Sequence, residues 1–99
     1  MSDIRAITIS ILPEGILRNF NGRLAWALHA LIVAGEKGCT PIDHPGPRWS
    51  GYVHKLRRPG LVIETCEERH AGRFPGRHAR YILRSRIEIV SIGDMEKAA

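Results

Sequence analysis

Apolar and polar residues alternate most clearly at the two ends of the chain. Within residues 4–12 (IRAITISIL), Ile7, Ile9 and Ile11 recur at every second position, which predicts a β-strand that ends before Pro13. Residues 13–22 contain glycines and an Asn-Gly pair, and we expect a connector there. Residues 86–92 (RIEIVSI) alternate in the same way, which predicts one more strand near the C-terminus.

A helical repeat governs residues 24–34. Leu24, Ala27, Leu28 and Leu31 recur at i, i+3, i+4 and i+7, and glycines follow the segment, so we expect a helix. Apolar residues also occupy its other side, so a second element must cover its back. The N-terminal strand can do so, and the alternative is a second copy of the chain in a homodimer formed through the N-terminal strand and this helix.

A second helix is expected over residues 47–58, where aromatic and aliphatic residues recur at helical spacing and predict a core-facing stripe. Thr40 as N-cap and Pro41 at the first helical position predict a one-turn helix before it. After it, two strand-like segments flank a loop that is rich in glycine and arginine, which predicts a β-hairpin with a basic tip at residues 70–78.

This order of elements predicts an α+β fold of the winged helix-turn-helix type: a three-helix unit and a β-hairpin wing, with extra N- and C-terminal strands. We expect residues 1–21 to form the N-terminal strand and connector, residues 22–92 the winged domain, and residues 93–99 a flexible tail. A chain of 99 residues is long enough for one domain.

Positive charge is concentrated in the helix and the hairpin. Ten of the fifteen Lys and Arg residues lie between Arg48 and Arg86, with only three of the ten Asp and Glu residues. That segment carries about +7 in a chain whose net charge is +5, so the rest of the chain is slightly acidic. A basic helix followed by a basic hairpin is suited to hold a nucleic-acid backbone from two sides, and we therefore expect double-stranded DNA as the partner.

The helix over residues 47–58 is the expected reading element. Arg48, Ser50 and His54 are placed for base edges in a major groove, whereas Lys55, Arg57 and Arg58 are placed for phosphates. A glycine in mid-helix, Gly51, costs about 1 kcal/mol relative to alanine, which suggests the close approach of DNA or of a packed neighbour. The alternative is a basic face that is only solvated.

In the wing, Arg73 and Arg77 are the candidates for a minor groove, while Phe74 is expected to fold back over the core. Three glutamates precede the loop and two arginines follow it on the returning strand. Cross-strand ion pairs between these residues would explain both sets on structural grounds. The members of the two sets are Glu64, Glu67, Glu68, Arg80 and Arg84.

No motif indicates an enzyme, a cofactor or a metal site. The chain lacks a nucleophile elbow, a phosphate-binding loop and paired carboxylates, and Cys39 and Cys66 lack zinc-ligand spacing. The longest apolar run is too short to span a bilayer, and the N-terminal residues lack the layout of a signal peptide. We therefore expect a soluble, cytoplasmic protein that does not enter a membrane, with two buried and reduced thiols.

Two segments resemble a known family. TPIDHPGPRWSGYVHKLRRPGLVIET (residues 40–65) and FPGRHARYILRS (residues 74–85) are similar to small winged helix-turn-helix proteins of bacterial genomes and prophage regions. The resemblance covers about two thirds of the chain and implies a winged helix-turn-helix domain that binds DNA. Pro45 and Pro47 shorten the helix before the recognition helix, which departs from ordinary domains of this type.

These observations lead to three hypotheses. The first is a non-enzymatic DNA-binding protein, a transcriptional regulator or a prophage-associated factor. If about five phosphates are neutralised, log K against log salt has a slope of about −4.5. The second is a protein-interaction module with an acidic partner, since winged helices also serve that role. The third is a structural homodimer assembled through the N-terminal strand, the first helix and the C-terminal strand, which is compatible with either of the others.

Overall fold

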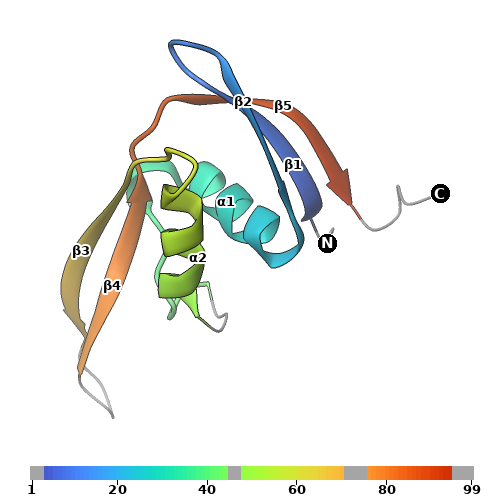
Figure 1. Ribbon diagram of the computed structural model, residues 1–99. Helices are drawn as coiled ribbons and strands as arrows, with labels where there is room; N and C mark the ends of the chain where they lie inside the picture. Colours follow the sequence, from blue (N-terminus) through green and yellow to red (C-terminus); the bar gives the residue numbers. More distant parts are fainter. Residues whose placement is uncertain (1–3, 45–47, 71–75, 95–99) are drawn as a thin grey trace.

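The computed structural model describes residues 4–44, 48–70 and 76–94, and within these it forms two α-helices, a short 3₁₀ helix and five β-strands (Figure 1). In chain order these are β1 (Ile4–Ile11), β2 (Ile16–Asn21), α1 (Gly22–Ala34), η1 (Gly35–Lys37), α2 (Trp49–Arg57), β3 (Ile63–His70), β4 (Gly76–Leu83) and β5 (Ile87–Asp94).

A three-stranded antiparallel sheet joins the two ends of the described chain, in the order β2-β1-β5. Ile7 and Ile9 of the central strand are 1% and 0% exposed, and they share one core with the buried residues of α1. Figure 1 shows the sheet along one side of α1. The prediction that the N-terminal strand covers the back of this helix is only partly confirmed: β1 packs on α1, but Trp26 on that side contacts Trp49 and Tyr52 of α2, and Val33 is 72% exposed. Because β1 is paired on both edges, a homodimer cannot form through the edge of that strand.

The segment expected to be a connector contains a strand. β2 pairs with β1 from Ile11↔Ile16 to Ala6↔Asn21, and a turn with a positive φ of 79° at Gly15 joins them. Its sequence, ILRNFN, buries only Phe20, because β2 lies at the edge of the sheet and is held mainly by its pairing with β1. An edge strand of this kind has no alternating pattern that could reveal it.

Helix α1 buries Ala25, Ala27, Leu28 and Leu31, as the helical repeat predicts, and it ends at Gly35 with a φ of 57°. Helix α2 packs on α1 through Trp49, Val53 and Leu56, which are 3%, 1% and 0% exposed. The core-facing stripe of the second helix is therefore confirmed, although the helix begins at Trp49 rather than at residue 47.

The expected third helix, at residues 40–43, is only a turn. Thr40 is buried and its hydroxyl accepts a hydrogen bond from the Asp43 amide at 3.0 Å, as an N-cap does. The His44 amide donates to the Thr40 carbonyl at 2.9 Å, and no further helical turn follows in the described residues. Pro45 disfavours a helical conformation at the residue before it, and both Pro45 and Pro47 lack the amide that a longer helix needs. The described residues therefore do not confirm the three-helix unit.

The hairpin of β3 and β4 extends away from the three-stranded sheet (Figure 1), and its register runs from Ile63↔Leu83 to His70↔Gly76. Its strands continue further toward the tip than expected. Residues 71–75 lie outside the described residues, and with them the predictions for Arg73 and Phe74. At the base of the hairpin, Cys39 and Tyr81 exchange two backbone hydrogen bonds of 2.9 Å, which join the segment after α1 to β4.

The C-terminal strand reaches Asp94, two residues beyond the predicted end of the winged domain, and Ile4 pairs with it. Residues on both sides of the expected boundary at residue 21 share one hydrophobic core. Among the described residues no helix is long and apolar enough to cross a membrane.

Candidate nucleic-acid interface

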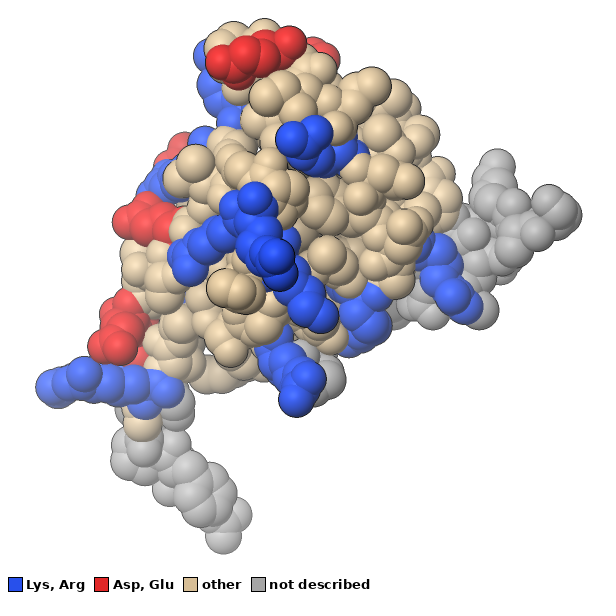
Figure 2. Space-filling model, viewed as in Figure 1, with Lys and Arg blue, Asp and Glu red and all other residues tan. Residues whose placement is uncertain are grey.

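The outer face of α2 is the candidate interface. Because Trp49, Val53 and Leu56 point into the core, the opposite side of the helix faces solvent. Figure 2 shows Lys and Arg side chains gathered in the middle of the molecular face on which α2 lies in front in Figure 1. The exposed residues of the helix and its C-terminal end include four of the predicted site residues: Ser50, His54, Lys55 and Arg58.

The sequence indicated that Arg48 lies within the first turn of the helix. In the structure Arg48 is exposed but precedes that turn. It is the N-cap of α2, with a left-handed φ of 68°, and its carbonyl accepts the Tyr52 amide at 3.1 Å. A non-glycine residue rarely adopts this conformation, and such residues concentrate at functional positions. The side chain of Arg48 is therefore presented at the end of the helix rather than along its outer face.

Arg57 has a structural role that its sequence position does not reveal. Its guanidinium donates to the Ile63 carbonyl through Nε at 3.2 Å and through Nη2 at 2.6 Å, and Nη2 also donates to Thr65 Oγ1 at 2.8 Å. These bonds tie the end of α2 to the start of β3. Because Nε and Nη2 of its guanidinium are engaged within the chain, Arg57 is a weaker candidate for phosphate contact than the sequence indicated.

An aromatic cluster fixes the orientation of α2. The Trp49 ring stacks on Tyr81 of β4, with ring centres 6.1 Å apart and an interplanar angle of 18°, and lies 5.6 Å from the Trp26 ring of α1. Its Nε1–H donates to the His44 carbonyl at 2.7 Å. One side chain thus joins α2 to α1, to the hairpin and to the turn before the helix.

The ion pairs expected across the hairpin are present. Arg84 contacts Glu64 at 2.6 Å, and Arg80 contacts Glu68 at 2.6 Å. Hydrogen bonds from these guanidiniums hold the pKa of Glu64 and of Glu68 below the usual range. Arg80 also donates to the Lys37 carbonyl at 2.7 Å, so it joins the hairpin to the segment after α1. Arg80 and Arg84 therefore belong to the scaffold, as predicted.

Arg77 lies on β4, near the tip of the described hairpin, and its pairing with Glu67 is loose. The two side chains are 3.4 Å apart and remain 63% and 74% exposed. Directly opposite Arg77 in the register is Arg69, which is also exposed and which the sequence analysis had not selected. Like charges that face one another across a hairpin repel, so an anion that bridges Arg69 and Arg77 would relieve this repulsion. Only the strand register could reveal the pair.

Neither cysteine forms part of a metal site in the described residues, where no group of three or more metal-binding side chains occurs. Both thiols are free. Cys39 is buried, as predicted, and burial raises the pKa of its thiol to about 11. Cys66 is only half-buried, because it lies on the hairpin face outside the main core.

The structure thus brings together the predicted residues of α2 on one outer face, with Arg48 at the start of that helix and Arg77 on the adjacent hairpin. Comparison with known families finds a match to the winged helix domain over residues 17–93. No curated protein and no solved structure matches the chain.

Proposed function

Because the chain belongs to the winged helix domain family, we propose that it is a non-enzymatic protein that binds double-stranded DNA, with the outer face of α2 in the major groove and the hairpin beside it. The observation that carries this proposal is the division of the basic side chains into two sets. Arg57, Arg80 and Arg84 are engaged within the chain. Lys55 and Arg58 are exposed and form no ion pair with a described residue.

Within this proposal, Ser50 and His54 face base edges, and Arg48 reaches the bases or the backbone from the start of the helix. Lys55 and Arg58 neutralise phosphates, and Arg77 with Arg73 contacts the neighbouring groove. Such a protein would act in the cytoplasm as a transcriptional regulator or as a prophage-associated DNA-binding factor.

The salt dependence of binding tests the mechanism. For about five neutralised phosphates, log K for a duplex should fall against log salt with a slope of about −4.5. Replacing both Lys55 and Arg58 with alanine should reduce that slope by about 2 and weaken all duplex sequences to a similar extent. Fluorescence anisotropy with random-sequence and selected duplexes, at several salt concentrations, measures both quantities.

The matched control replaces Arg5 and Arg18, which are exposed on the three-stranded sheet, with alanine. This variant loses the same charge but should keep nearly the whole slope, because only α2 and the hairpin are proposed to meet the phosphates. A nearly flat salt dependence of the wild type would overturn the DNA-binding proposal. It would favour the alternative of a protein-interaction module with an acidic partner. An equal reduction of the salt slope in both variants would instead indicate general electrostatic attraction between a basic protein and DNA.

Replacing Gly51 with alanine should affect stability and DNA binding in opposite directions. A Cβ at residue 51 would meet only Arg48 Cβ, at 3.7 Å, and Gly51 has an ordinary helical conformation, so the chain itself does not require a glycine there. Alanine should raise the free energy of unfolding by about 0.5–1 kcal/mol. Since Gly51 lies near the middle of the outer face, an added methyl group should weaken binding about tenfold if DNA approaches the helix backbone.

Urea denaturation and anisotropy on the same protein preparation measure the two effects of Gly51→Ala. Ser50→Ala is the neighbouring control for a small change on the exposed side of the helix. A Gly51→Ala variant that gains stability and binds DNA as tightly as the wild type would show that DNA does not approach the helix at this point.

A further inference from the structure

Strand β5 leaves one edge of the three-stranded sheet open. It pairs with β1 on one side only, and no described strand lies on the other side. Residues 88–92 are exposed, including Ile89, Val90 and Ile92 at 42%, 56% and 41%. Between residues 87 and 93 the strand has neither lysine nor proline; of the devices that protect an edge from association, it has one charged residue, Glu88, and a β-bulge at Val90.

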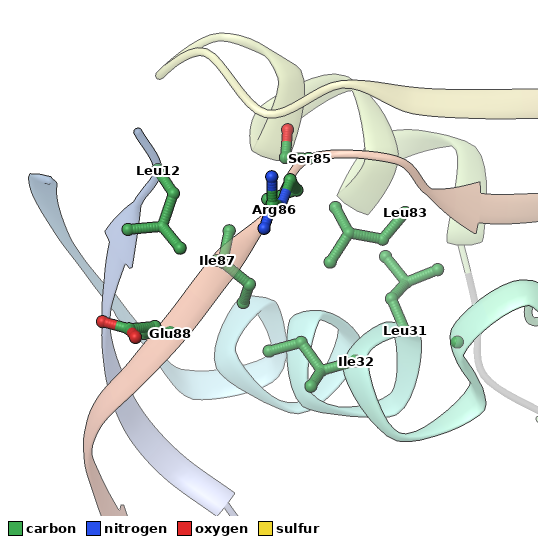
Figure 3. A pocket seen from close by; sticks show the side chains of 9 residues that line it. Leu12, Leu31, Ile32, Leu83, Ser85, Arg86, Ile87 and Glu88 are labelled. Carbon is green, nitrogen blue, oxygen red and sulfur yellow. The ribbon is translucent and has the colours of Figure 1, made fainter. Parts of the chain in front are cut away.

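The inner face of β5 is also incompletely covered. Ile87, Ile89 and Ile92 lie opposite isoleucines of β1, but α1 covers β1 more completely than it covers this edge strand. At the start of β5 a cavity of about 480 Å³ opens between the strand and the end of α1. Figure 3 shows Ile32 of α1 and Ile87 of β5 pointing toward one another there, with Arg86 and Glu88 nearby.

We propose that β5 is a homodimer interface at which a second copy of the chain pairs antiparallel with this edge, so that two three-stranded sheets become one six-stranded sheet. In a two-fold dimer the same patch occurs on both sides and must be complementary to itself. In an antiparallel pair the end of one β5 lies beside the start of the other, where each cavity is. The second copy therefore adds both a strand at the edge and apolar side chains near the cavity.

The residue pattern of β5 is self-complementary in one register. Setting Ile87 opposite Ile92 of the second copy also sets Ile89 opposite Val90 and Glu88 opposite Ser91. Val90 is the extra residue of a β-bulge, which keeps Ile89 and Ile92 on the same face of the sheet despite their odd spacing. Aliphatic residues thus face aliphatic residues, and each glutamate faces a serine rather than a second glutamate. This self-complementary order of aliphatic and polar residues is the reason to assign the edge to a second copy.

The proposed dimer interface and the proposed DNA interface lie apart on the molecule. Figure 1 places β5 on the far side of α1 from α2, and the hairpin extends away from the sheet. Pairing at β5 therefore leaves the outer face of α2 free in each copy. Of the two strands expected in a homodimer interface, the N-terminal strand has both edges occupied, by β2 and β5, whereas the C-terminal strand β5 keeps one open edge.

Sedimentation velocity of the full chain after nuclease treatment, between about 5 and 200 μM, tests this interface. We expect a monomer–dimer equilibrium that Val90→Lys weakens at least tenfold, because it places a positive charge at the centre of the pairing. The matched control is Leu17→Lys, which adds the same charge at a 60% exposed residue of β2, the opposite edge strand. This control should dimerise like the wild type, and circular dichroism checks that both variants are folded.

The proposal is overturned if the wild type stays monomeric at all concentrations. It is also overturned if a folded Val90→Lys variant dimerises like the wild type, or if only Leu17→Lys loses the dimer. Hydrogen exchange of the wild type needs no variant and decides the matter if Val90→Lys does not fold. Amides of residues 87–94 should exchange more slowly at the high protein concentration than at the low one. Equal exchange at both concentrations would contradict a dimer through β5.

Discussion

Replacing Trp49 with alanine is expected to lower the free energy of unfolding by about 3–5 kcal/mol, the usual range for a buried tryptophan. Its side chain is 3% exposed and contacts α1 at Trp26 and the hairpin at Tyr81. It also donates a hydrogen bond to the His44 carbonyl. A domain of this size has a total stability of only about 5–15 kcal/mol, so much of the variant should unfold under mild denaturant.

Urea denaturation followed by circular dichroism measures this loss, and Trp49→Phe is the matched control. Phenylalanine keeps a ring against Tyr81 but cannot donate to His44, so we expect a smaller loss of about 1–2 kcal/mol. DNA binding of Trp49→Ala should fall with the folded fraction, because α2 is oriented by this residue. A loss of stability below about 1 kcal/mol in Trp49→Ala would mean that other contacts hold the helix in place.

Replacing Gly38 with alanine should be comparably damaging, for a different reason. A Cβ there would lie 2.6 Å from the Tyr81 carbonyl oxygen and 2.9 Å from Ile82 Cγ1, and Gly38 has a positive φ of 73°. The Tyr81 carbonyl cannot retreat without breaking its 2.9 Å hydrogen bond from the Cys39 amide. Steric overlap and backbone strain together should lower the free energy of unfolding by about 2–5 kcal/mol.

Gly22→Ala separates these two causes. Gly22 also has a positive φ, 66°, but a Cβ there would have no heavy atom within 4 Å, so this variant should show the backbone strain alone, about 1–2 kcal/mol. Both variants can be compared by urea denaturation. If Gly38→Ala is no less stable than Gly22→Ala, the close approach of Tyr81 to residue 38 does not constrain the fold.

The local patterns of the chain predicted its main elements because each depends on residues close in sequence. The stripe through Trp49 and Leu56 requires only the helical repeat, and it correctly placed Lys55 and Arg58 outside the core. The ion pairs of the hairpin were predictable because hairpin connectivity brings the two strands together, although the partners of each glutamate depend on the register.

Other features were missed because they depend on residues far apart in sequence. Arg57 and Arg58 are adjacent basic residues, and only the position of β3 shows that Arg57 is engaged by Ile63. Arg69 becomes a candidate for contact with an anion only when the strand register places it opposite Arg77. The expected one-turn helix after Thr40 is a hydrogen-bonded turn, and the one-turn segment is too short for the local pattern to distinguish the two.

Periodicity, charge and turn residues act over short distances, so the two helices, the basic hairpin, the concentration of positive charge and the resemblance to winged helix proteins were all predictable from the chain alone. Three features depend on the folded arrangement: which arginines remain available, the close approach of Gly38 to Tyr81, and the free edge of β5 rather than β1. These features result from contacts between residues that are far apart in sequence. A local sequence pattern does not predict which distant residues come into contact.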